Sequence, residues 1–199
     1  MRWGSKSDDD QITDDSSGDC VRVLGTDMFY YGDIDDDNIL EFITKFKKIE
    51  RDLLKKAIDL PGYNPVITVH IKSDGGDVFA GLSAMDHIAA SKLEVHTIAD
   101  GLCASAATFM LMGGDKRMML PNACVLIHQL SSGFWGKFEE MKNELENCEK
   151  FMAIITNIYR EHTKIPPKKL DEMMKRDIHL TATECLRFSV IDEVYPGTS

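Results

Sequence analysis

Residues 65–99 read PVITVHIKSDGGDVFAGLSAMDHIAASKLEVHTIA, and this stretch decides the fold of the 199-residue chain. It opens with a β-branched segment, Pro65–Ile71, which is typical of a buried strand. A Gly-Gly turn follows, and apolar residues at helical spacing then predict a helix from Val78 to Ala90. Leu93–Ala99 is a second strand. A strand, a helix and a strand in so short a span predict an α/β domain built from parallel βαβ units.

The flanking sequence continues this alternation. Val21–Tyr31 (VRVLGTDMFYY) predicts a strand with a turn inside it, and Asp35–Asp37 cap a helix that ends at Leu60. An Ala-rich helix is expected from Ser105 to Met112, followed by a short strand at Cys124–Ile127. We therefore expect one α/β domain over residues 21–199, a length that can bury a single core.

The net charge of −10 is concentrated near the N-terminus. Residues 1–37 contain eleven Asp and only three basic residues. We interpret residues 1–20 as an acidic, disordered tail, with a regulatory or partner-binding tail as the alternative. The rest of the chain is nearly neutral, so neither nucleic acid nor an anionic membrane is a predicted partner.

Composition and short motifs indicate the cellular compartment and whether a cofactor is needed. No apolar run approaches the ~20 residues of a membrane span, and the N-terminus has no apolar targeting segment. There is no Gly-x-x-x-x-Gly-Lys-Ser/Thr motif for a nucleotide. The five cysteines are scattered and show no CxxC spacing, which suits a reducing compartment and argues against a zinc site. They are Cys20, Cys103, Cys124, Cys148 and Cys185. Together these observations predict a soluble cytoplasmic protein without metal or cofactor.

One predicted helix is longer than a small domain needs. No proline interrupts residues 134–163, and Pro166-Pro167 follows. Apolar residues recur along it at alternating intervals of three and four, as in a coiled-coil seam. We expect this helix to project and to contact another subunit, the alternative being that it lies across its own core. The seam comprises Phe138, Met141, Leu145, Cys148, Met152, Ile155 and Tyr159.

Three short segments contain residues suited to catalysis. Ser73–Asp77 (SDGGD) follows a buried strand, and its glycines can leave amide N–H groups free to face an oxyanion. Gly101–Ala107 (GLCASAA) places Ser105 among small residues where a strand gives way to a helix. His128 ends an apolar strand, where α/β sheets carry their active sites. Taken singly, these segments also suit a turn, a packing serine and a core histidine.

Together the three segments indicate nucleophilic catalysis. A serine hydroxyl needs a histidine to accept its proton, and that histidine needs a carboxylate to fix its tautomer. The hydrolase motif Gly-x-Ser-x-Gly is absent around Ser105, and chymotrypsin and subtilisin place their serine last. A serine followed by a histidine and then an acid, with a Gly-Gly turn upstream, points to another family.

At these segments the sequence resembles the proteolytic subunit of the Clp protease, from about Phe29 to Val194. That family carries Ser-Pro-Gly-Gly, Gly-x-Ala-Ala-Ser, Met-Ile-His-Gln-Pro, Arg-Asp-x-x-Leu-Ser-Ala and Gly-Leu-Val-Asp in this order. The matching segments here are Ser73–Gly76, Gly101–Ser105, Leu126–Leu130, Arg176–Ala182 and Ser189–Asp192, with Asp74 and Leu130 in place of the two prolines and Cys103 in place of an alanine.

The resemblance implies a role for each site residue. Ser105 would be the nucleophile, His128 the base and Asp177 the orienting acid. The backbone N–H groups of Gly76 and Ala106 would form the oxyanion hole. No metal-binding or cofactor-binding residue is implied.

The resemblance also implies an assembly and a substrate. It implies a ClpP/crotonase-like fold of repeated ββα and βαβ units with a projecting handle helix, here residues 134–163. Two heptameric rings would stack through this helix and enclose a chamber in which peptides and unfolded proteins are cut. An AAA+ unfoldase is the implied partner.

Three substitutions predict weakened docking of that unfoldase. Thr68, His70 and Asp100 stand where typical members place tyrosines or an apolar residue of the docking pocket. We therefore interpret the chain as a divergent member of viral or other atypical origin, acting in the cytoplasm of a bacterium or of a virus-infected cell.

Several alternatives stay open at this stage. Asp171 and Asp192 compete with Asp177 for the third catalytic role. A crotonase-like enzyme acting on CoA thioesters shares the fold but does not need a Ser–His pair. A non-catalytic shell subunit and a capsid-maturation protease of the same fold are the other two interpretations.

Overall fold

The computed structural model describes residues 20–195, so nearly all of the predicted acidic tail lies outside the described residues. The first strands, β1 (Val21–Leu24) and β2 (Asp27–Tyr31), form an antiparallel hairpin, as the turn inside that segment predicts. Helix α1 (Asp36–Asp59) begins where Asp35 accepts a 2.8 Å hydrogen bond from the Asn38 N–H.

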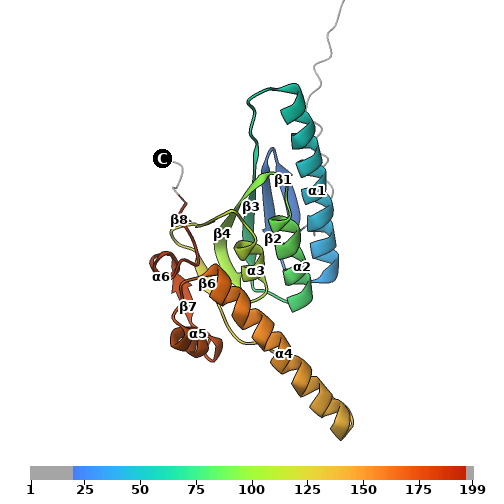
Figure 1. Cartoon of the computed structure of the whole chain (residues 1–199), viewed down its shortest axis with the longest axis vertical. Coiled ribbons are helices and arrows are strands. Elements are labelled where there is room, and N and C mark those ends of the chain that lie inside the picture. Colours follow the sequence, from blue (N-terminus) through green and yellow to red (C-terminus); the bar gives the residue numbers. More distant parts are fainter. Residues whose placement is uncertain (1–19, 196–199) are drawn as a thin grey trace, which may run out of the picture.

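The sheet is mainly parallel, as predicted. From β2 onward its path runs through β3 (Val66–Ser73), β4 (Glu94–Ala104), β5 (Lys116–Met119) and β8 (Glu193–Val194), with every neighbouring pair parallel. Figure 1 shows these strands as a twisted sheet with helices packed over one side. The predicted strand at 93–99 is part of β4, which continues to Ala104 and thereby reaches Ser105.

Two short strands branch from the end of β4. Strand β6 (Cys124–Leu126) pairs in parallel with its last three residues, and β7 (His179–Thr181) pairs antiparallel with β6. The chain thus brings two later segments beside the residues that follow β4.

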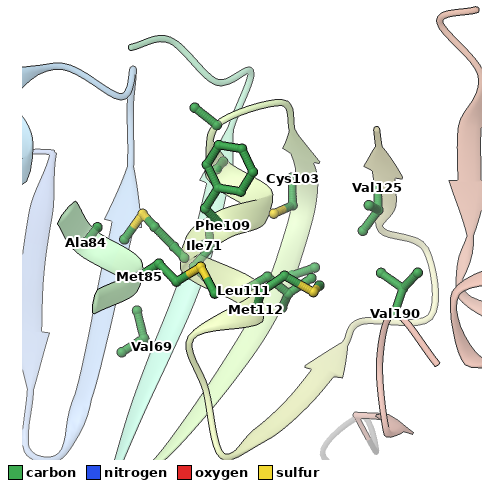
Figure 2. Packing of buried hydrophobic residues seen from close by; sticks show 14 of the residues in the cluster. Val69, Ile71, Ala84, Met85, Cys103, Phe109, Leu111, Met112, Val125 and Val190 are labelled. Atoms are coloured by element: carbon green, nitrogen blue, oxygen red, sulfur yellow. The ribbon is translucent and has the colours of Figure 1, made fainter. Parts of the chain in front are cut away.

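The core lies between this sheet and helices that include α1, α2 (Val78–Ala89) and α3 (Ala107–Met112). Side chains alternate between buried and partly exposed along β3, which is the pattern of a sheet covered fully on one face. Figure 2 shows Val69 and Ile71 of β3 beside Met85 of α2 and Phe109 of α3. Every residue of α3 is buried, so the segment that follows Ser105 is held firmly.

The long helix, α4 (Phe138–His162), begins four residues later than predicted. Gly133 and Gly136 precede it, and glycine disfavours helix. The helix projects from the body, with its Phe138 end far from the sheet (Figure 1). Only Ile155 and Tyr159, both in its C-terminal half, are buried. The helix therefore rests on its own core at one end and leaves the other end uncovered.

Two small helices, α5 (Pro167–Met174) and α6 (Ala182–Arg187), complete the fold beside β7. None of the helices in residues 20–195 combines the length and apolar character that a membrane crossing requires.

Candidate active site

Ser105 occupies a tight junction between β4 and α3. Its φ of 54° is left-handed, a conformation that L-residues rarely adopt and that costs about 1–3 kcal/mol. Hydrogen bonds hold it there: its N–H donates to the Leu126 carbonyl at 2.9 Å, and its own carbonyl accepts from the Thr108 N–H at 3.0 Å. A strained, well-anchored serine between a strand and a helix is a common setting for a nucleophile.

The pairing of β4 with β6 brings His128 beside Ser105. Ala104 pairs with Leu126, so Ser105 lies one residue and His128 two residues beyond a matched pair. Both side chains line the same pocket. Within residues 20–195 no hydrogen bond joins the serine hydroxyl to the imidazole ring, so proton transfer between them requires a small side-chain adjustment.

The pairing of β6 with β7 brings Asp177 to the other side of His128. Leu126 pairs with His179, and the strands are antiparallel. His128 lies two residues after Leu126 and Asp177 two residues before His179, so the two face each other. The distance from His128 Nδ1 to Asp177 Oδ1 is 3.7 Å, longer than a hydrogen bond. The side chain of Asp177 is 78 % exposed and that of His128 is 25 % exposed, so the carboxylate is the solvated partner.

The Gly-Gly turn faces Ser105 at very close range. A Cβ atom on Gly75 would lie 2.6 Å from the Ser105 Cβ, and its φ of 103° also requires glycine. The turn is anchored to Ile34, whose N–H donates to the Gly75 carbonyl and whose carbonyl accepts from the Asp77 N–H. These bonds leave the Gly76 N–H without a protein acceptor among the described residues.

The structure separates Asp177 from its two competitors. Asp192 accepts hydrogen bonds from Arg117, among them one of 2.7 Å from the guanidinium and one of 2.8 Å from the backbone N–H. Burial alone would raise the pKa of Asp192, but these bonds outweigh burial and hold the pKa below its ordinary value. Asp171 is exposed on α5. Of the three candidates, only Asp177 makes an ion pair with His128.

The pocket around Ser105 is narrow, with a cavity volume of about 70 Å³. Gly76 and Ala106 border it, and apolar residues of α2, α3 and α4 form its walls. Among these are Val78, Phe109, Ile155 and Tyr159. An apolar wall beside a serine, a histidine and two backbone N–H groups suits acyl transfer on a peptide held by its side chains.

No group of three or more potential ligands in residues 20–195 is placed to hold a metal ion. Comparison with known proteins shows which family the chain belongs to. The family model described as Clp protease matches residues 28–198. The chain belongs to the Clp protease family.

Relatives agree with this assignment over most of their length. The ATP-dependent Clp protease proteolytic subunit of Deinococcus radiodurans is 34 % identical over 155 residues, which cover 76 % of each chain. The subunit of the same name from Staurastrum punctulatum is 37 % identical over 134 residues, 66 % of this chain and 67 % of that one. Membership makes this Clp-family chain a serine peptidase and confirms the recognition made from its motifs.

A solved structure has the same fold. A mutant of ClpP1 from Listeria monocytogenes superposes with a TM-score of 0.74, covering 87 % of this chain and 92 % of that one at 23 % identity. The predicted ClpP-like α/β fold is therefore confirmed.

Two residues next to the candidate site, Thr108 and Tyr159, were not predicted as site residues from the sequence. Their hydroxyl groups meet behind Ser105. The only signal was a hydroxyl-bearing tyrosine at the end of an otherwise apolar seam, since a buried tyrosine needs a hydrogen-bond partner.

Proposed function

We propose that this chain is a serine endopeptidase that cuts peptides and unfolded proteins through Ser105, His128 and Asp177. The support is one feature of the sheet: the registers of β4 with β6 and of β6 with β7 bring the serine, the histidine and the carboxylate to one region. Gly76 and Ala106, whose backbone N–H groups have no acceptor within residues 20–195, border the pocket that Ser105 and His128 line.

Each residue has a distinct task in the proposed reaction. His128 accepts the Ser105 proton as the hydroxyl oxygen attacks the substrate carbonyl, and it later gives that proton to the leaving amine. Asp177 orients the imidazole and stabilises its charged form. The N–H groups of Gly76 and Ala106 stabilise the oxyanion of the tetrahedral intermediate. We expect the 3.7 Å contact of His128 with Asp177 to shorten when substrate binds, since catalytic hydrogen bonds are often long in free enzymes.

A fluorophosphonate probe tests this assignment directly. We expect the intact protein to gain one probe, located by peptide mass spectrometry on Ser105, because only an activated serine attacks phosphorus readily. Substitution His128→Ala should reduce the labelling rate by about 10²-fold or more, since it removes the base. The matched control is His96→Ala, because His96 pairs with Glu94 at 2.8 Å, away from the pocket. Equal labelling of both variants, or probe on another serine, would contradict the proposal.

We further propose that copies of the chain assemble into stacked rings, with heptamers the expected unit, around an internal chamber. The support is the uncovered end of α4, where Phe138, Met141 and Leu145 are all more than half exposed. An apolar stripe of this kind is unusual on a monomer and marks an interface. Leu145 also borders a groove with Leu130 and Met152, which a second copy of α4 could fill.

The outer face of the sheet carries the substitutions that predict weak unfoldase docking. His70 stacks on Phe29 with a 4.5 Å centroid distance, and its Nδ1 lies 3.3 Å from the Asp100 carboxylate. Asp100 also accepts a hydrogen bond from the Tyr31 hydroxyl. Burial and this bond raise the pKa of Tyr31 to about 12, so the phenol stays a neutral donor. These polar groups interact with one another and do not form an apolar pocket. Such a surface favours a partner other than an unfoldase that inserts an apolar loop.

We therefore expect a bacterial Clp ATPase, with ATP, to give little degradation of a tagged folded substrate. Each lost aromatic anchor removes burial worth about 1.5–3 kcal/mol, and the loss is multiplied across a ring. Short fluorogenic peptides should still be cut, because they diffuse in unaided. The variant Thr68→Tyr/His70→Tyr/Asp100→Met should gain degradation. Efficient degradation by the parent would show that this surface tolerates the polar residues.

A further inference from the structure

A chain of hydroxyl groups runs from α4 to the backbone of Ser105. The Tyr159 hydroxyl lies 2.5 Å from Thr108 Oγ1, and Thr108 Oγ1 donates to the Ser105 carbonyl at 2.6 Å. Both side chains are buried, with Tyr159 1 % and Thr108 0 % exposed. Tyr159 is thus in contact with the nucleophile's own peptide group through a single intermediate.

The direction of the two bonds is fixed by counting protons. The Ser105 carbonyl can only accept, so the single proton of the Thr108 hydroxyl must point to it. Thr108 Oγ1 therefore accepts from Tyr159, whose phenol must donate. Burial raises the pKa of Tyr159 well above its ordinary value, which keeps the phenol in its donating form. Each bond polarises the next and strengthens it.

The carbonyl at the end of this chain belongs to the peptide group that holds the Ala106 N–H. A trans peptide is planar, so its C=O and N–H point in opposite directions. The Thr108 hydroxyl and the Thr108 N–H both bind this carbonyl from the α3 side. The Ala106 N–H must then point the other way, and Ala106 borders the pocket. Fixing the carbonyl therefore fixes the direction of one oxyanion donor.

The left-handed backbone of Ser105 makes this anchoring necessary. A residue at φ 54° relaxes toward negative φ when its surroundings allow it, and such a rotation would turn the following peptide group. Since donors in an oxyanion hole must be held in place before the reaction, even a modest turn of the Ala106 N–H would weaken its effect.

We infer that Tyr159 and Thr108 are positioning residues that aim and strengthen the Ala106 N–H of the oxyanion hole. This inference rests on the proposed function, because it presupposes that Ser105 is the nucleophile. The two ends of α4 would then have different roles. The buried end supports the active site through Tyr159, and the exposed end is proposed to join the subunits.

The test uses hydroxyl deletions that keep shape. Tyr159→Phe should lower kcat for a fluorogenic peptide by about three- to tenfold, and Thr108→Val by about tenfold or more, a fraction of the loss of a whole oxyanion donor. KM should stay near the parental value, because the bond acts in the transition state. Thr108→Ser keeps the hydroxyl and should restore most of kcat.

A second readout separates positioning from a general loss of stability. A peptide boronate forms a tetrahedral adduct with Ser105 whose oxygen occupies the oxyanion hole, whereas a product-like peptide only fills the pocket. Tyr159→Phe and Thr108→Val should weaken boronate binding by the same factor as kcat, with product binding unchanged. The matched control is Thr97→Val, because buried Thr97 Oγ1 donates to the Leu111 carbonyl of the same helix at 2.8 Å, away from Ser105. It should lower the melting temperature comparably and leave kcat and boronate affinity near the parental values.

The outcomes separate this inference from the proposed function. If parental hydrolysis does not depend on Ser105, the proposed function and this inference both fall. If hydrolysis depends on Ser105 but both hydroxyl deletions keep parental kcat and boronate affinity, the inference alone is overturned. It is also overturned if Thr97→Val reduces boronate affinity as much as Thr108→Val does.

Discussion

Substitution Ser105→Ala should reduce peptide hydrolysis by about 10⁴-fold or more, with no comparable change in stability. The variant removes one hydroxyl oxygen and leaves a base with nothing to activate. What remains is the slow hydrolysis that the oxyanion hole and the pocket support without a nucleophile. Alanine and serine tolerate the left-handed conformation about equally, so the melting temperature should change little.

Turnover of a fluorogenic short peptide under saturating conditions is the measurement. A matched control is Ser83→Ala, which removes a hydroxyl from a partly exposed position on α2, outside the pocket, and should keep parental turnover. If Ser105→Ala cut the peptide at the parental rate, another residue would have to be the nucleophile. The roles given to His128 and Asp177 would fall with it, since both are defined by their relation to Ser105.

Substitution Met141→Asp/Leu145→Asp should split the proposed assembly. Both side chains are more than half exposed in the single chain, so the change should leave the fold of each subunit intact. Covering two carboxylates with apolar side chains of another copy costs several kcal/mol, repeated at every subunit of a ring. Mass photometry at nanomolar concentration should therefore show the parent as a large species and the variant as a single ring or smaller.

The chain offers a control that adds the same charge elsewhere. Asn143 and Asn147 are exposed on the opposite side of α4, so Asn143→Asp/Asn147→Asp introduces two carboxylates without touching the stripe. This variant should keep the parental mass. If both variants assembled alike, or if the parent ran as a monomer at micromolar concentration, α4 would not be the contact between subunits.

Much of the fold could be predicted because its signals are local. The β-branched run that forms β3, the Asp35 cap of α1 and the helical spacing of α2 are each visible within about ten residues. The Gly-Gly turn and the small residues around Ser105 are visible for the same reason. Small residues permit tight backbone geometry at one place in the chain, and this can be seen in the sequence without knowledge of distant contacts.

The remainder depends on contacts that no short window contains. Strand β5 (KRMM) and strand β7 (HLT) are too short to show a period, and each exists only through its neighbour in the sheet. Asp177 was assigned from the resemblance, because its place opposite His128 arises from the antiparallel register of β6 and β7. Tyr159 was expected in a seam between subunits, yet it lies buried against its own α3, since the seam passes from exposed to buried along α4.

The order of strands in this sheet also bears on how the chain folds. Strand β5 pairs with β4 on one side and with β8 on the other. In the second pair Met118 lies opposite Glu193, so most of the C-terminal half of the chain separates the two strands in sequence. Parallel pairing at such separation must close a long loop before it gains any contact, and this makes folding slow. Ser105 and His128, by contrast, come from strands that are near neighbours in sequence and can meet early. Asp177 joins them only when β7 pairs with β6, which must bring His179 to Leu126. We expect a refolding chain to bring Ser105 and His128 together first, and to gain Asp177 and the β5–β8 pair later, so that activity returns after most of the secondary structure has formed.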